Sequence, residues 1–146
     1  MIFDPADLLT HISNYSLCMH VKIDTREKFH VITVLEPQLA ANMTAELENS
    51  LIPFLQNGVK NLVVIVKDIK FMDKAAAECL VDLQQRFYDC GASLVICQLD
   101  PKVETALDDS GILEWLNVAP TESEAIDIVQ LEEIERELQD GEELNT

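Results

Sequence analysis

The fold of this chain is decided by residues 62–73, which read LVVIVKDIKFMD. Five apolar residues, four of them β-branched, run from Leu62 to Val66 between polar neighbours. A run this short is typical of a strand buried on both faces of a sheet, whereas a membrane span needs about 20 apolar residues. A charged turn and a second short apolar piece, residues 69–72, then lead to Asp73. The sequence predicts a buried strand, a loop and the start of a helix.

Apolar residues return every three or four positions after Asp73, which is the period of an amphipathic helix. Asp73 is expected to cap this helix, and Gly91 can end it in the left-handed conformation. The apolar face consists of Ala76, Leu80, Leu83 and Phe87, with Ala77, Val81 and Tyr88 beside it.

The segment Phe71-Met72-Asp73, between a buried strand and an amphipathic helix, resembles the hallmark loop of the STAS fold, which sulfate transporters and bacterial anti-sigma factor antagonists share. Further along, Asp100-Pro101 opens a short helix, a turn at Ser110–Leu113 follows, and a final amphipathic helix completes the family's order of elements. The likeness covers about Ser16 to Leu138 and rests on that order. It implies an α/β fold, with a mixed β-sheet of about four to five strands and packed α-helices in a single domain.

The loop also shows where this chain departs from the family. In phosphorylatable members the loop continues Asp-Ser-Ser-Gly or Asp-Ser-x-Gly, and a partner kinase phosphorylates the first Ser. Here Lys74 stands at the acceptor position, Ala75 at the second Ser and Ala76 at the Gly. The resemblance therefore implies no phosphorylation site in this loop, but it does imply a partner-binding loop of Met72, Asp73, Lys74 and Ala75.

Lys74 is an unusual residue for the first turn of a helix, because the positive end of the helix dipole disfavours a cation by about 0.3 to 1 kcal/mol. Two explanations remain open. The long side chain can swing into solvent beside Asp68 or Asp73, or it can contact an acidic group on a partner.

Composition sets the remaining bounds. A chain of 146 residues, 48% of them hydrophobic, can bury one core. We expect an N-terminal extension with a short helix over residues 1–15, a STAS-like domain over residues 16–139 and an acidic tail over residues 140–146. The first residues show neither a signal peptide nor a transmembrane segment, so a cytoplasmic protein is expected.

A net charge of −17 argues against nucleic acid and anionic membranes as partners, because both are bound through Lys and Arg. The charge favours basic partner surfaces, although it also serves solubility alone. In the acidic C-terminal segment a solvated helix face is favoured over a docking surface.

The chemistry of a site is sparse. Four cysteines without a Cys-x-x-Cys pair suit reduced, buried thiols, and no metal site is predicted from His20, His30 and Cys18, which lack a fourth ligand. The histidines are expected at the surface or at an interface. No cofactor-binding or catalytic motif occurs, and an enzyme using Cys90 or Cys97 with a histidine is disfavoured because apolar surroundings raise a thiol pKa.

Other elements follow from periodicity. Alternation predicts a hairpin of a strand from Leu17 and a strand over Phe29–Leu35, and a helix should follow to Asn57-Gly58, ended or kinked early by Pro53. A strand over Ser93–Cys97 should join Leu62–Val66 in parallel. The predicted core contains Val64, Ile65, Leu80, Leu83, Val95 and Ile96.

The C-terminal part holds two further predictions. Trp115 is expected to close the edge of the core. Thr121 and Glu124 form a capping box that opens the last helix. The apolar positions of that helix are Ile128, Leu131, Ile134 and Leu138.

We therefore expect a non-catalytic STAS-domain regulatory protein of the bacterial cytoplasm that binds a protein partner, similar to anti-sigma factor antagonists in transcription regulation. It could also pair with a second copy of itself. An alternative is a cytoplasmic STAS subunit of a transport or signalling assembly, and an alternative of another class is a Cys/His-dependent enzyme.

Overall fold

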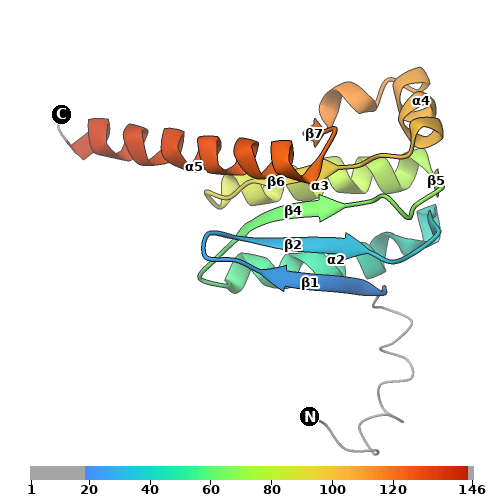
Figure 1. The fold of residues 1–146 in the computed structure, drawn as a ribbon, viewed down its shortest axis with the longest axis horizontal. Coiled ribbons are helices and arrows are strands. Elements are labelled where there is room, and N and C mark those ends of the chain that lie inside the picture. Colours follow the sequence, from blue (N-terminus) through green and yellow to red (C-terminus); the bar gives the residue numbers. More distant parts are fainter. Residues whose placement is uncertain (1–18, 145–146) are drawn as a thin grey trace, which may run out of the picture.

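A five-stranded mixed sheet forms the centre of the fold (Figure 1). The computed structural model describes residues 19–144, and the side chains of residues 19–139, so the predicted N-terminal helix lies outside the described residues. The strand order is β1-β2-β4-β6-β7, with β1 antiparallel to β2 and every other pair parallel, as the crossover pattern predicts. The strands are β1 Val21–Thr25, β2 Phe29–Val34, β4 Asn61–Ile65, β6 Leu94–Cys97 and β7 Val118–Ala119.

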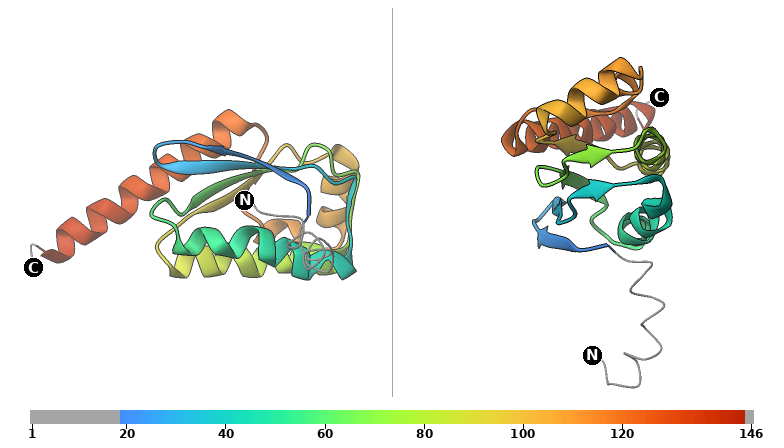
Figure 2. Two further views of the ribbon diagram at one scale, coloured as in Figure 1. Left: turned by 90° about the horizontal axis from the view of Figure 1, so that it is seen from below. Right: turned by 90° about the vertical axis from the view of Figure 1, so that its right-hand side faces the viewer.

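Helices cover both faces of the sheet (Figure 2). Helices α2 and α3 pack on one face and α5 on the other. Pro53 acts as predicted, because α2 ends at Leu51 and a 3-10 turn takes over where proline cannot continue an α-helix. The helices are α2 Thr44–Leu51, α3 Lys74–Asp89, α4 Pro101–Asp109 and α5 Glu122–Leu144, with 3-10 turns η1 Ala41–Met43, η2 Ile52–Gln56 and η3 Leu113–Trp115.

Two apolar layers form the core, one on each side of the sheet. Alternate strand residues such as Val64 and Ile96 pack with Leu80 and Leu83 of α3, and the residues between them pack against α5. The six predicted core residues are all buried, which confirms that part of the sequence analysis.

A second, two-stranded sheet was not predicted. Strand β3, Gln38–Leu39, pairs in parallel with β5, Phe71–Met72. The apolar piece at the end of residues 62–73 is therefore held by main-chain bonds to the segment that follows β2.

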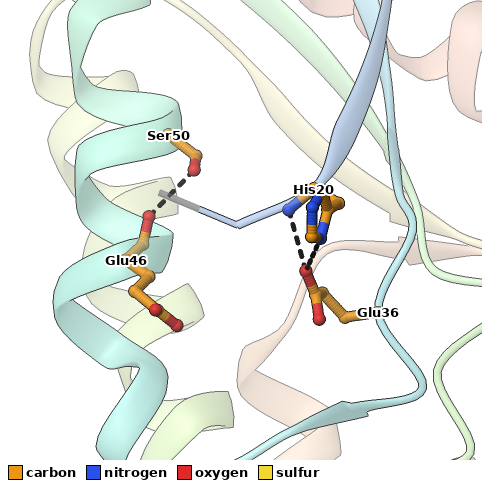
Figure 3. A network of polar contacts seen from close by, with 4 residues as sticks. All are labelled: His20, Glu36, Glu46 and Ser50. Atoms are coloured by element: carbon orange, nitrogen blue, oxygen red, sulfur yellow. Dashed lines mark hydrogen bonds and ion pairs between the residues drawn. The ribbon is translucent and has the colours of Figure 1, made fainter. Parts of the chain in front are cut away.

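His20 closes the open end of the hairpin. Main-chain N–H of His20 donates to Glu36 Oε2 at 2.8 Å, and its ring Nδ1 lies 3.1 Å from the same oxygen. Figure 3 shows the His20 ring turned to Glu36. The same view shows a separate bond within α2, which Ser50 Oγ donates to the Glu46 carbonyl. His20 is exposed, as expected.

His30 does not fit the prediction of a surface position. His30 is 3% exposed, and its ring nitrogens bond to Thr25 Oγ1 and to the Val59 carbonyl, each at 2.9 Å. Strand β2 lies inside the sheet between β1 and β4, and the His30 ring packs on Phe54 of η2. Both faces of β2 are covered, so alternation with a wet face was the wrong expectation.

Trp115 and Cys90 also correct the sequence analysis. Trp115 is 63% exposed, and Ile112 and Leu116 close the core instead. Cys90 follows the last turn of α3 and is exposed, whereas Cys79 is half-buried and Cys97 buried. These three thiols, the ones within the described residues, are free, and Cys18 lies outside those residues.

Helix α5 begins as the capping box predicts, with Thr121 Oγ1 accepting from Glu124 N at 3.2 Å. Ala125 and Val129 pack on the sheet. Leu131, Ile134 and Leu138 are 57%, 52% and 64% exposed, so most of the predicted apolar stripe faces away from the protein. The second half of α5 runs past the ends of the strands (Figure 1).

Candidate partner-binding site

The predicted loop lies where the parallel strands end and α3 begins. Two main-chain hydrogen bonds join the loop to residues 37–39: Lys70 N donates to Pro37 O at 2.8 Å, and Asp73 N donates to Leu39 O at 2.9 Å. Together with the β3–β5 pairing, these bonds make the approach to α3 a rigid element rather than a free loop.

Asp73 occupies the N-cap position with extended backbone, but its carboxylate makes no cap bond to α3. Instead, Asp73 Oδ2 accepts from Ala41 N at 2.7 Å, at the start of η1. Asp73 is therefore the N-cap residue, as predicted, but its carboxylate does not bond to α3 and instead ties the beginning of α3 to the segment leading into α2.

The four predicted loop residues differ in exposure. Met72 is buried, Asp73 is half-buried, and Lys74 and Ala75 are exposed. Phe71, which the sequence analysis did not count as a site residue, is 51% exposed beside them. Any contact with another molecule at this place would therefore involve Phe71, Lys74 and Ala75.

Lys74 is a free cation within the described residues. No hydrogen bond or ion pair joins it to another side chain between residues 19 and 139, and the first turn of α3 contains no acidic residue. No ion pair joins Lys74 to the adjacent Asp73 or to Asp68, six residues earlier.

A second loop meets the first through an ion pair. Lys70 Nζ lies 3.2 Å from Asp100 Oδ2, and Asp100 Oδ1 accepts from Lys102 N at 2.9 Å, which confirms Asp100 as the cap of α4. These contacts, with the Lys102 main-chain bond the largest, lower the pKa of the Asp100 carboxyl. Three of the ten Lys and Arg residues of this acidic chain, Lys67, Lys70 and Lys74, lie within eight residues of one another. This clustering in the sequence could have indicated the site.

The cysteines offer little chemistry. Burial, with a smaller contribution from Glu122, raises the pKa of the Cys97 thiol to about 12, and burial raises that of Cys79 to about 11. Within the described part of the chain no cluster of His, Cys, Asp and Glu could hold a metal ion. None of the described helices is long and apolar enough to cross a membrane.

Comparison with solved structures places the fold. An anti-sigma factor antagonist from Mycobacterium paratuberculosis aligns with 77% of this chain and 94% of its own, at 12% identity and a TM-score of 0.65. The phosphorylated Bacillus cell fate determinant SpoIIAA aligns with 75% of this chain and 99% of its own, at 17% identity and a TM-score of 0.53. The murine anion transporter Slc26a9 aligns over 86% of this chain but only 24% of its own, at 14% identity and a TM-score of 0.63.

These identities show a shared fold. The sequence itself matches the STAS domain over residues 20–125, which is more than half of the chain and includes the loop, α3 and the beginning of α5. The mixed five-stranded sheet, the helices on both of its faces and this match lead to one conclusion: the chain belongs to the STAS domain family.

Proposed function

We propose that this chain is a non-catalytic regulatory STAS protein that binds a partner protein through Phe71, Lys74 and Ala75, with Met72 and Asp73 holding these residues in place. The observation that carries the proposal is the exposed, unpaired Lys74 at the positive end of α3, with the exposed Phe71 three residues before it. An apolar and cationic surface of this kind suits a partner with acidic and apolar groups.

In this proposal the protein lacks the usual switch of the family. Phosphorylation would add a charge of about −1.5 to −2 to the loop. Lys74 instead keeps a positive charge there, so a serine kinase cannot change the charge of the loop at this position. The likeness to anti-sigma factor antagonists supports a role in the bacterial cytoplasm, in transcription regulation.

Catalysis is not part of the proposal. The raised pKa of Cys97 keeps its thiol protonated near neutral pH, and His30 is already bonded at both ring nitrogens. Cofactors and nucleic acid are likewise left out, because the net charge of −17 opposes phosphate-rich ligands.

A second candidate is a subunit of a larger transport or signalling assembly. The likeness to part of an anion transporter favours it, since this chain covers only 24% of that protein. Here too the domain would act by binding protein.

The decisive experiment compares Lys74→Glu with Lys22→Glu, an exposed lysine on β1. Partners captured with the wild-type protein would be purified, and their affinities measured by calorimetry at moderate salt. We expect Lys74→Glu to weaken complex formation and Lys22→Glu to leave it unchanged. Equal affinity of the wild type and Lys74→Glu would remove Lys74 from the interface.

A separate assay tests the missing switch. Residues 71–75 contain no hydroxyl side chain, so incubation with radiolabelled ATP and the kinases captured as partners should leave the protein without a phosphate that changes partner binding. Label on a Ser or Thr elsewhere in the chain that weakened partner binding would contradict the proposal.

A further inference from the structure

Helix α5 presents an apolar row to solvent. Leu131, Ile134 and Leu138 lie on one side of the helix because three and four residues span about one turn. Three exposed acidic residues share that side. We call the whole set the outer face of α5: Leu131, Ile134 and Leu138 with Glu124, Asp127 and Glu135.

Bonds on the opposite side fix the rotation of the helix. Ala125 and Val129 pack on the sheet, and Glu132 and Arg136 continue the same inward row. Ser93 Oγ donates to Glu132 Oε1 at 2.5 Å, and Arg136 donates to Ser93 Oγ at 3.1 Å.

Asn61 extends this anchor. Its Oδ1 accepts from Arg136 Nη2 at 3.2 Å, and its Nδ2 donates to Glu133 Oε1 at 3.1 Å. Asn61 and Ser93 are buried polar residues at the amino ends of β4 and β6, where a lost partner is costly. The apolar row therefore cannot turn inward without breaking this network.

The charges of the outer face select its occupant. Arg136, the sole basic residue from Glu122 to Leu144, points inward, so the carboxylates of the outer face have no cation beside them on the helix. A second copy of this face would bring carboxylates against carboxylates, which is unfavourable.

We propose that the outer face of α5 binds a cationic amphipathic helix of a partner protein. Apolar residues of that helix would cover Leu131, Ile134 and Leu138, and flanking Lys or Arg residues would pair with the glutamates. This surface is separate from the Lys74 site: α5 is anchored at the amino ends of β4 and β6, whereas α3 begins beyond their carboxyl ends (Figure 1). It also lies mostly beyond residue 125, where the match to the STAS domain ends.

The test uses fluorescein-labelled peptides and anisotropy. One peptide carries Leu at helical three-four spacing with Lys at the remaining positions, a second has Glu in place of Lys, and a third scrambles the order of the first. We expect the ordered Lys peptide to bind most tightly and the Glu peptide not to bind. Comparable binding of the scrambled or the Glu peptide would overturn the proposal.

Matched variants place the peptide on α5. Leu131→Gln/Ile134→Gln/Leu138→Gln should weaken binding about tenfold or more, whereas Ile23→Gln/Leu35→Gln, equally exposed apolar residues elsewhere, should not change it. Circular dichroism confirms that each variant is folded. Unchanged affinity in the α5 variant would refute the proposal.

Two further measurements separate the alternatives. Light scattering should find a monomer, and a dimer that the α5 variant dissociates would assign the outer face to a second copy and overturn the proposal. Lys74→Glu should leave peptide binding unchanged, so failure at one surface is distinguishable from failure at the other.

Discussion

Helices α3 and α5 both carry apolar residues at helical spacing, but those of α3 are buried and most of those of α5 are exposed. In α3 the apolar residues at helical spacing, Leu80, Leu83 and Phe87 among them, are all but fully buried against the sheet. In α5 the apolar side chains of Leu131, Ile134 and Leu138 are exposed to solvent. Glu132 and Arg136 face the protein instead.

The difference shows what helical periodicity does and does not determine. It predicts that a helix has an apolar face, because three- and four-residue spacing places side chains together. It does not say whether the same chain supplies the surface that covers that face. In α5 the polar anchors Asn61 and Ser93, far away in sequence, decide the rotation.

The most direct way to break this comparison is to shorten one leucine in each helix. Leu83→Ala should lower the free energy of unfolding by about 2 to 5 kcal/mol, because it leaves a cavity in the core. Leu131→Ala should change it by no more than about 0.5 kcal/mol. Urea denaturation measures both, and equal losses would mean that α5 is covered within the chain.

The next effect concerns the anchor of α5. Arg136→Ala should cost about 1 to 3 kcal/mol, because it takes a partner from both Ser93 and Asn61. Glu135→Ala, the neighbouring residue on the outer face, is the control and should cost about 0.5 kcal/mol at most.

Thiol labelling shows whether loss of the anchor at Ser93 and Asn61 reaches the other end of α5, where Glu122 lies near Cys97. Cys97 lies in the apolar layer under α5, whereas Cys90 is exposed. Arg136→Ala should speed alkylation of Cys97 and leave that of Cys90 unchanged. Unaltered protection of Cys97 would show that the anchor holds only the second half of α5 to the sheet.

A smaller effect on stability is expected at the start of α3, which differs from the start of α5 in charge. The first turn of α5 contains Glu122 and Glu124, whereas that of α3 contains Lys74 and no acid. Lys74→Glu should therefore raise the free energy of unfolding of the protein by about 0.3 to 1 kcal/mol. Lys74→Gln should give part of that gain, and a loss of stability in Lys74→Glu would show that Lys74 stabilises the fold.

The smallest effect is expected at the start of α4. The lowered pKa of Asp100 means that its ionised form stabilises the protein above the ordinary pKa of about 3.9 and that this contribution is lost as pH falls through the lower folded-state pKa. Asp100→Asn should reduce the acid sensitivity of unfolding below about pH 4. Denaturation midpoints across this range should differ from those of Asp109→Asn, and identical pH profiles would contradict the prediction.

Much of the fold could be predicted because local signals agreed with each other. The short apolar runs at Leu62–Val66 and Ser93–Cys97 became parallel central strands, and Pro53 ended α2. Asp100 followed by Pro101 opened α4, since cap and proline both act within one turn.

The failures involve residues whose position depends on distant parts of the chain. His30 was placed by the covering of both faces of β2, and Asp73 by the main-chain N–H of Ala41. The position of Trp115 depends on Gln84, whose Nε2 donates to the Trp115 carbonyl at 2.6 Å. This bond holds the backbone of η3, and the Trp115 ring stays exposed. At the candidate site, spacing could indicate Lys74 but not that Met72 is buried.

The edges of the main sheet constrain how another protein can approach. Strand β7 has two residues and is followed by Pro120, which has no N–H, and the other edge strand, β1, carries Lys22 and Asp24. Short or charged edges discourage the addition of a foreign strand. The chain is therefore poorly suited to β-augmentation and to edge-to-edge aggregation, and its complexes must form through side chains on helices and loops.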